Sequence, residues 1–186
     1  MGLTTKIAIT AVLLAICIAS QFLKNLSVYI TGPIVNLCLV LAVMTAGLWW
    51  GLALAVVTPV TAFLIAASPV MQMVPGIIPL IAAGNAVLVV LGYFLFRPAV
   101  LQKKVLISIP SVVMAIVCSV AKAAFMGLTI SLWLLPTFIP QESKLYNNMP
   151  VFQMTFSVTQ GVTALIGFVY FFIVWVPLRK SFLQGE

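Results

Sequence analysis

Charged residues are scarce in this sequence, and acidic residues are almost absent. Only 6% of the 186 residues are charged, whereas a soluble domain usually carries about 25%. The two acids are Glu142 and Glu186, and histidine does not occur. Because so few charges cannot cover a water-facing surface, these shortages exclude an ordinary soluble domain.

The sequence also lacks the patterns that usually carry chemistry. Without histidine there is no Ser–His pair for hydrolysis. Cys17, Cys38 and Cys118 stand alone in apolar stretches, without the spacing of a metal site or a disulfide framework. No glycine-rich phosphate loop is present, so the chain is not expected to hydrolyse ATP. We therefore expect a protein that is not an enzyme, with no catalytic residues, no metal and no cofactor.

Long apolar runs dominate what remains, and 64% of the residues are hydrophobic. No charged residue occurs between Asn25 and Phe96. As one helix this stretch would run about 108 Å, more than three bilayer cores of about 30 Å. We predict an all-α integral membrane protein, one domain over residues 1–186 with six transmembrane helices. The expected spans are 6–23, 34–48, 50–67, 77–96, 105–128 and 151–176.

Proline and glycine set the expected ends of these spans. A turn at 31–33 precedes the second span, Arg97-Pro98 ends the fourth, and Pro177 ends the sixth. Three longer connections, rich in proline and amides, are expected on one side of the bundle at about 24–33, 68–76 and 129–150. Loops longer than about twelve residues usually have a function. This indicates that recognition takes place at the side of the bundle that carries these connections.

The basic residues indicate the orientation. Six spans place both termini on the same side of the membrane. Six of the basic residues lie on that side, and two lie on the other. Cytoplasmic loops are enriched in lysine and arginine, so we predict a cell-membrane protein with both termini in the cytoplasm. The net charge of +7 is spread over loop ends and does not suggest nucleic acid. The first group is Lys6, Arg97, Lys103, Lys104, Arg179 and Lys180, and the second is Lys24 and Lys144.

Lys122 is the strongest candidate for a binding residue, because it lies between small apolar residues inside the fifth span. A lysine at the centre of a membrane helix costs about 3 kcal/mol, and such residues usually face a cavity or a partner. A ligand role implies a substrate with a carboxylate or another acceptor. The alternative is a lysine whose ammonium reaches the outer headgroups.

Other polar and aromatic residues fall at a similar depth and indicate a pocket open to the outer face. An amide in lipid must find a partner, so each alone also fits helix–helix packing. The aromatic residues also fit an interfacial belt. The predicted substrate-binding residues are Asn36, Asn85, Lys122, Trp133, Tyr146, Gln153 and Gln160, with Thr58, Thr61, Tyr29 and Phe152 as further members of this group.

Three alanines on the first span, Ala11, Ala15 and Ala19, are spaced four residues apart. This spacing forms a smooth stripe along one helix face that allows another helix to approach closely. The stripe is therefore a candidate docking surface for a partner, although packing within the bundle is equally compatible with it.

Taken over essentially its whole length, the chain resembles the substrate-binding S-components of energy-coupling factor (ECF) vitamin transporters. These are six-helix prokaryotic membrane proteins of about this length. The resemblance lies in the alanine stripe and in three segments, which are Gly32-Pro33-Ile34-Val35-Asn36, Ala46-Gly47-Leu48-Trp49-Trp50-Gly51 and Pro79-Leu80-Ile81-Ala82-Ala83-Gly84-Asn85.

The resemblance implies a subunit that captures a vitamin or related micronutrient from outside with high affinity. It further implies that the alanine stripe docks onto a transmembrane T-component, with two cytosolic ATPases completing an ABC importer. No motif specific to one substrate is present. A stand-alone channel or facilitator for a small solute is the alternative, and a membrane enzyme would need a catalytic group that the sequence does not offer.

Overall fold

The computed structural model describes residues 2–23, 27–74, 76–101 and 108–184, and it is all helical over these ranges. Six helical segments are long and apolar enough to cross a membrane, which confirms the predicted fold class. Four are α1 (Leu3–Gln21), α2 (Val28–Thr45), α3 (Leu48–Ala66) and α5 (Ile77–Leu101). The fifth runs through α6 (Ile109–Met126), η1 (Gly127–Leu134) and α7 (Leu135–Phe138), and the sixth through α8 (Met149–Phe156) and α9 (Val158–Gln184). Two short helices, α4 (Pro69–Met73) and η2 (Tyr146–Asn148), lie in connections.

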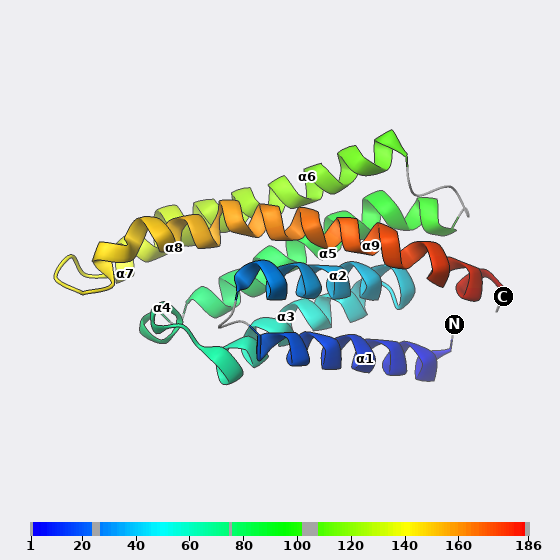
Figure 1. Cartoon of the computed structure of the whole chain (residues 1–186), viewed down its shortest axis with the longest axis horizontal. Coiled ribbons are helices and arrows are strands. Elements are labelled where there is room, and N and C mark those ends of the chain that lie inside the picture. Colours follow the sequence, from blue (N-terminus) through cyan, green and yellow to red (C-terminus); the bar gives the residue numbers. More distant parts are fainter. Residues whose placement is uncertain (1, 24–26, 75, 102–107, 185–186) are drawn as a thin grey trace.

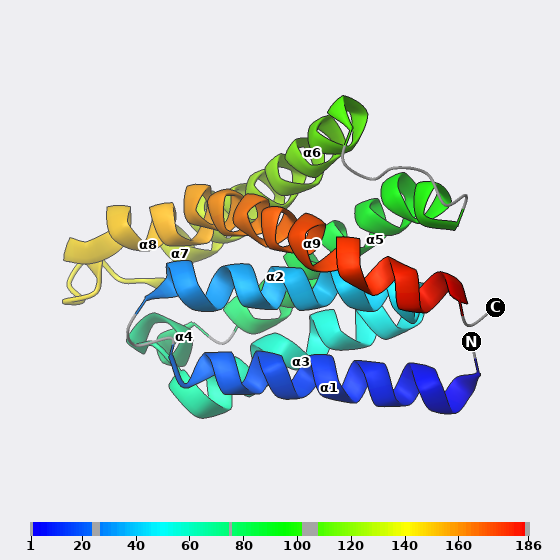
Figure 2. The same cartoon turned by 45° about the vertical axis from the view of Figure 1, so that its right-hand side comes forward.

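Helix α2 lies at the centre of the bundle. It packs against α1, α3, α5 and α9, while α6 closes the far side by packing against α5 and α9. Figures 1 and 2 show this arrangement, with α1 and α3 on one side of α2 and α6 on the other. The beginning of α1 and the end of α9 lie at the same end of the molecule. We call this the terminal end, and the other the distal end.

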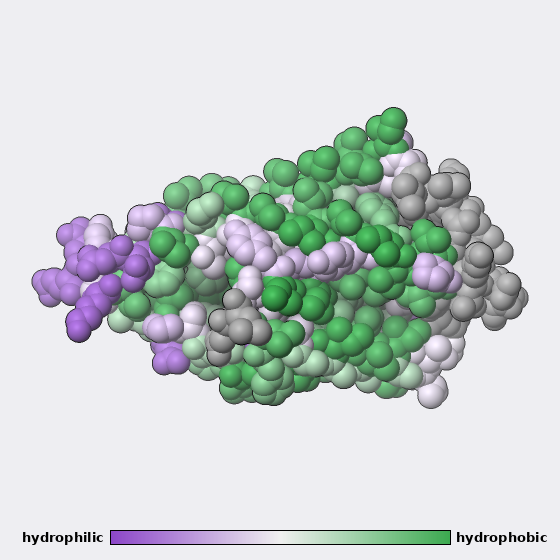
Figure 3. All heavy atoms as spheres, viewed as in Figure 1, coloured by the Kyte–Doolittle hydropathy of each residue, from purple (hydrophilic) through white to green (hydrophobic). Residues whose placement is uncertain are grey.

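The surface is apolar along the body and hydrophilic at the distal end, as Figure 3 shows. Large apolar side chains face outward from most spans, among them Val12, Val56, Val117 and Ile173. Exposed apolar side chains on every side of a helix bundle are what lipid requires as a solvent. The hydrophilic distal cap contains the connection between α7 and α8.

The interior is divided into two apolar clusters. One lies towards the terminal end and contains Phe96, Phe168 and Phe171. The Phe96 and Phe168 rings are stacked with centroids 5.3 Å apart. The other cluster joins η1, α4 and α8, and includes Val70, Ile130 and Phe156. The three cysteines are free and buried, as the sequence indicated.

The apolar spans Ile77–Pro98 and Tyr146–Leu178 end close to the ends expected at 96 and 176. The helices themselves continue past the prolines, because Pro33 lies inside α2, Pro98 inside α5 and Pro177 inside α9. Each proline removes one backbone hydrogen bond, and these helices tolerate that loss. The turn expected at 31–33 is therefore the first part of α2, which begins at Val28.

The distal connections also differ from the prediction. The fifth segment stays helical to Phe138, so the loop expected from residue 129 begins ten residues later in the chain. The connection at 68–76 contains α4. The predicted start of the fifth span at 105, and Lys24, Lys103 and Lys104, lie outside the described residues.

Candidate binding cavity with a buried lysine

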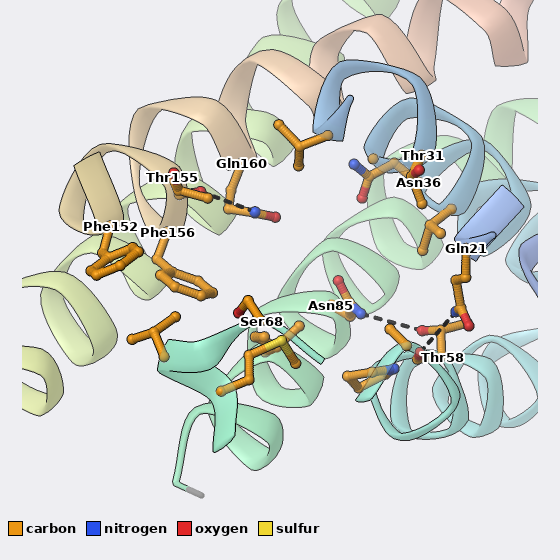
Figure 4. A pocket seen from close by; sticks show the side chains of 18 of the residues that line it. Gln21, Thr31, Asn36, Thr58, Ser68, Asn85, Phe152, Thr155, Phe156 and Gln160 are labelled. Carbon is orange, nitrogen blue, oxygen red and sulfur yellow. Dashed lines mark hydrogen bonds between the residues drawn. The ribbon is translucent and has the colours of Figure 1, made fainter. Parts of the chain in front are cut away.

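The distal half of the bundle contains a partly open cavity of about 320 Å³. Its walls come from the distal ends of the spans, together with α4 and α8. Figure 4 shows Phe152 and Phe156 on one side of this space, and Asn36, Asn85, Gln21 and Thr58 on the other. The cavity is thus asymmetric, with an aromatic wall and a polar wall. Its size is that of a small-molecule site.

Lys122 is the centre of the polar wall. Its side chain is 2% exposed, and its Nζ donates to Asn36 Oδ1 at 2.6 Å and to Asn85 Oδ1 at 2.8 Å. Residues 36, 85 and 122 belong to α2, α5 and α6, so the ammonium links three spans. We call these three residues the lysine–amide cluster. The alternative in which Lys122 reaches the headgroups does not agree with this geometry.

Each amide of the cluster is held in place by its surroundings. Asn85 Nδ2 lies 3.5 Å from both Ala55 O and Thr58 Oγ1 on α3, which directs its oxygen towards Lys122. Asn36 packs against Gly167 on α9, where an added Cβ would lie 2.7 Å from Asn36 Cβ. The positions of both acceptors therefore depend on neighbouring helices as well as on their own.

Gln21 forms the second polar feature of the same wall. It is 1% exposed, and its Nε2 donates to Thr58 O and to Thr61 Oγ1, both at 3.0 Å. Its Oε1 is buried and has no hydrogen-bond partner among the described residues. Buried acceptors are nearly always satisfied, so this oxygen is an acceptor that lacks its donor. Sequence reasoning missed Gln21, although a glutamine within an apolar span was a usable signal.

The aromatic wall depends on an interruption between α8 and α9. Ser157 has a non-helical backbone (φ −120°, ψ −91°), and Gln160 Nε2 donates to the carbonyl oxygen of Thr155 across this break at 3.1 Å. The break lets α8 turn Phe152 and Phe156 towards the cavity. Phe156 was not predicted, because nothing in the sequence marks where the sixth segment is interrupted.

The structure brings four of the seven predicted binding residues to the cavity, namely Asn36, Asn85, Lys122 and Gln160. Gln153 instead joins two helices, because its Nε2 donates to Ser131 O at 3.0 Å while Ser131 Oγ donates to Gln153 O at 2.8 Å. Trp133 and Tyr146 are 58% and 39% exposed and do not line the cavity. A substrate-binding role for these residues stays a prediction.

The alanine stripe lies on the outer face of the bundle. Ala11, Ala15 and Ala19 are exposed, while Leu13, Cys17 and Gln21 face inward. Packing within the bundle therefore does not account for the stripe. It faces lipid or a partner.

Comparison of the chain with protein-family models, with curated proteins and with solved structures finds no significant match. The chain is a six-span helical membrane protein with a mostly apolar cavity in its distal half, one wall of which is polar.

Proposed function

We propose that this protein is the substrate-binding membrane subunit of an importer, of the kind that S-components provide in ECF transporters. In this role it captures a vitamin or related micronutrient from outside. The distal end then faces outward and both termini face the cytoplasm. A transmembrane T-component and two cytosolic ATPases complete the importer.

The cavity of about 320 Å³ beside the lysine–amide cluster is the observation that carries this proposal. Polar groups buried in a membrane bundle usually mark a substrate path or site. Here three such groups converge from α2, α5 and α6, and connections at the distal end contribute α4 to the cavity wall. A buried polar wall opposite an aromatic wall is suited to one small amphipathic molecule.

The packing supports a closed binding site in preference to an open channel. Below the cavity, the terminal half is filled by buried side chains that include Leu39, Phe96, Phe168 and Phe171. A solute cannot pass through interior packing of this density without a rearrangement of the helices. Release on the other side then requires motion driven by partners, which is the role of the other subunits.

The exposed alanine stripe supplies the partner surface in this proposal, and it offers a direct test. Ala15→Trp places a bulky ring on the stripe and is expected to prevent association with the T-component and the ATPases, because close helix approach needs small residues. Vitamin uptake by cells should be lost. The melting temperature of the purified subunit should be unchanged, because Ala15 is exposed.

Ala53→Trp is the matched control, because Ala53 is also an exposed alanine, on α3. Co-purification from the organism that encodes the chain, followed by mass spectrometry of the complex, measures association. The account expects an ATPase pair and a T-component with the wild type and with Ala53→Trp, and their loss with Ala15→Trp. Normal uptake by the Ala15→Trp variant contradicts the docking role, and flux into liposomes by the wild-type chain alone favours the channel alternative.

A further inference from the structure

We propose that the cavity selects a small ring-containing monocarboxylate, whose carboxylate binds at Lys122 and Asn36. This inference rests on the proposed binding function and specifies the chemistry of the ligand.

The first argument is the charge of Lys122. Its two hydrogen-bond partners are amide oxygens, which carry no net charge. The acids of the chain are Glu142, exposed in the distal connection, and the C-terminal Glu186, so none lies in a span. A buried cation is normally paired with an anion. The ligand is therefore expected to bring the negative charge that the chain does not supply.

The second argument is the number of donors at the polar wall. A lysine ammonium has three N–H donors, and the two amides accept two of them. The Nδ2 of Asn36 donates no hydrogen bond among the described residues. One N–H of Lys122 and the amide of Asn36 thus remain for an acceptor in the cavity. A carboxylate has two oxygens and accepts from both.

The remaining wall determines the body of the ligand. Phe152 and Phe156 face the polar wall across the cavity, and aromatic side chains favour flat rings by stacking. The volume of about 320 Å³ is at the lower end of the range of small-molecule sites, about 300–1,000 Å³. This space takes one ring system with short substituents.

Matched acid and amide probes test the charge requirement. The pairs are 4-aminobenzoate with 4-aminobenzamide, and indole-3-acetate with indole-3-acetamide. Binding to the full chain in lipid nanodiscs is followed by the shift of its melting temperature with probe concentration. We expect each acid to bind about tenfold or more tightly than its amide.

Two variants connect this preference to Lys122. Lys122→Met should remove the preference for acids. Asn85→Asp keeps the shape of the cluster and supplies an internal carboxylate to Lys122, so it should also abolish acid binding even if Lys122→Met does not fold. Val60→Met, at an exposed position of α3 that does not line the cavity, is the control.

The outcomes separate this inference from the proposed function. Amides that bind as well as acids, or no melting shift with any acid in the folded wild type, overturn the carboxylate assignment. An acid preference that survives in Asn85→Asp overturns the role of Lys122. Acid binding by a chain that never associates with ATPases keeps the ligand class and overturns the transport role. Uptake with a partner complex, together with a preference for amides, keeps the transport role and overturns the ligand class.

Discussion

Asn36 reaches Lys122 because Gly167 leaves room for it. The two helices α2 and α9 pack closely at this point, and an added Cβ on Gly167 would also lie 3.1 Å from Pro33 O. Nearby, a Cβ on Gly32 would lie 2.8 Å from Thr163 Cβ. The polar wall of the cavity thus depends on residues without side chains as much as on the amides themselves.

Gly167→Ala is therefore expected to displace Asn36 and to weaken the lysine–amide cluster. Overpacking of this kind typically costs about 1–3 kcal/mol of unfolding free energy. Thermal unfolding in detergent measures the cost. Gly92→Ala is the matched control, because its nearest neighbour, Met44 Cε, is 4.0 Å away, and it should be neutral or slightly stabilising. An equal loss of stability in both variants contradicts the close packing at Gly167.

The residues of the site were predictable where their polarity stood out from apolar surroundings. Lys122, Asn36 and Asn85 carried that signal, because a polar group within a membrane span must have a partner. Which partner it has was not predictable. Gln153 and Gln160 had the same signal, yet Gln153 bonds to Ser131 and Gln160 lines the cavity, since the break at Ser157 separates them.

Among the helices, the short turn between α2 and α3 shows how another helix stabilises the end of a span. Gly47 has a positive φ of 107°, a conformation that other residues rarely adopt. Arg97 of α5 lies beside it and donates from Nη1 to Val43 O at 2.7 Å, in the last turn of α2. The guanidinium also lies 5.2 Å from the centre of the Tyr93 ring. The free carbonyl groups of a helix end thus find a donor from another helix.

Arg97→Met should lower the unfolding free energy by about 1–3 kcal/mol, because a hydrogen bond from a charged group to a partly buried carbonyl is lost. Unfolding in detergent as a function of temperature measures this change. Lys144→Met removes an exposed cation in the distal connection and serves as the control. An Arg97→Met variant as stable as the control contradicts the role of Arg97 in closing the turn.

Helix existence followed from the apolar runs, whereas helix ends did not. Pro33, Pro98 and Pro177 lie inside helices, where the loss of one backbone hydrogen bond at each proline is tolerated. The continuous helical path from α6 through η1 to α7 was also not predictable from the sequence. Its apolar residues fit a helix as well as an interfacial connection, and only packing against α8 decides between the two.

At the scale of the whole molecule, the two halves of the bundle have different interiors. The terminal half is a packed apolar core that includes the aromatic residues Phe96, Phe168, Phe171 and Trp175. The distal half has a mostly apolar cavity with one polar wall, under a hydrophilic cap. The chain alone predicted this division, because its polar residues and long connections fall on one side. It did not predict the aromatic wall, which depends on the three-dimensional path of α8.

The most direct measurement is native mass spectrometry of the protein purified from the organism that encodes it, compared with Ala62→Trp. Ala62 lines the cavity, so the added ring fills the space without touching the charge of Lys122. The account predicts one bound small molecule on the wild type and none on Ala62→Trp, with similar melting temperatures. The same bound mass on both proteins, or a wild type that takes up no small molecule from an extract of that organism, would contradict a binding function of this cavity.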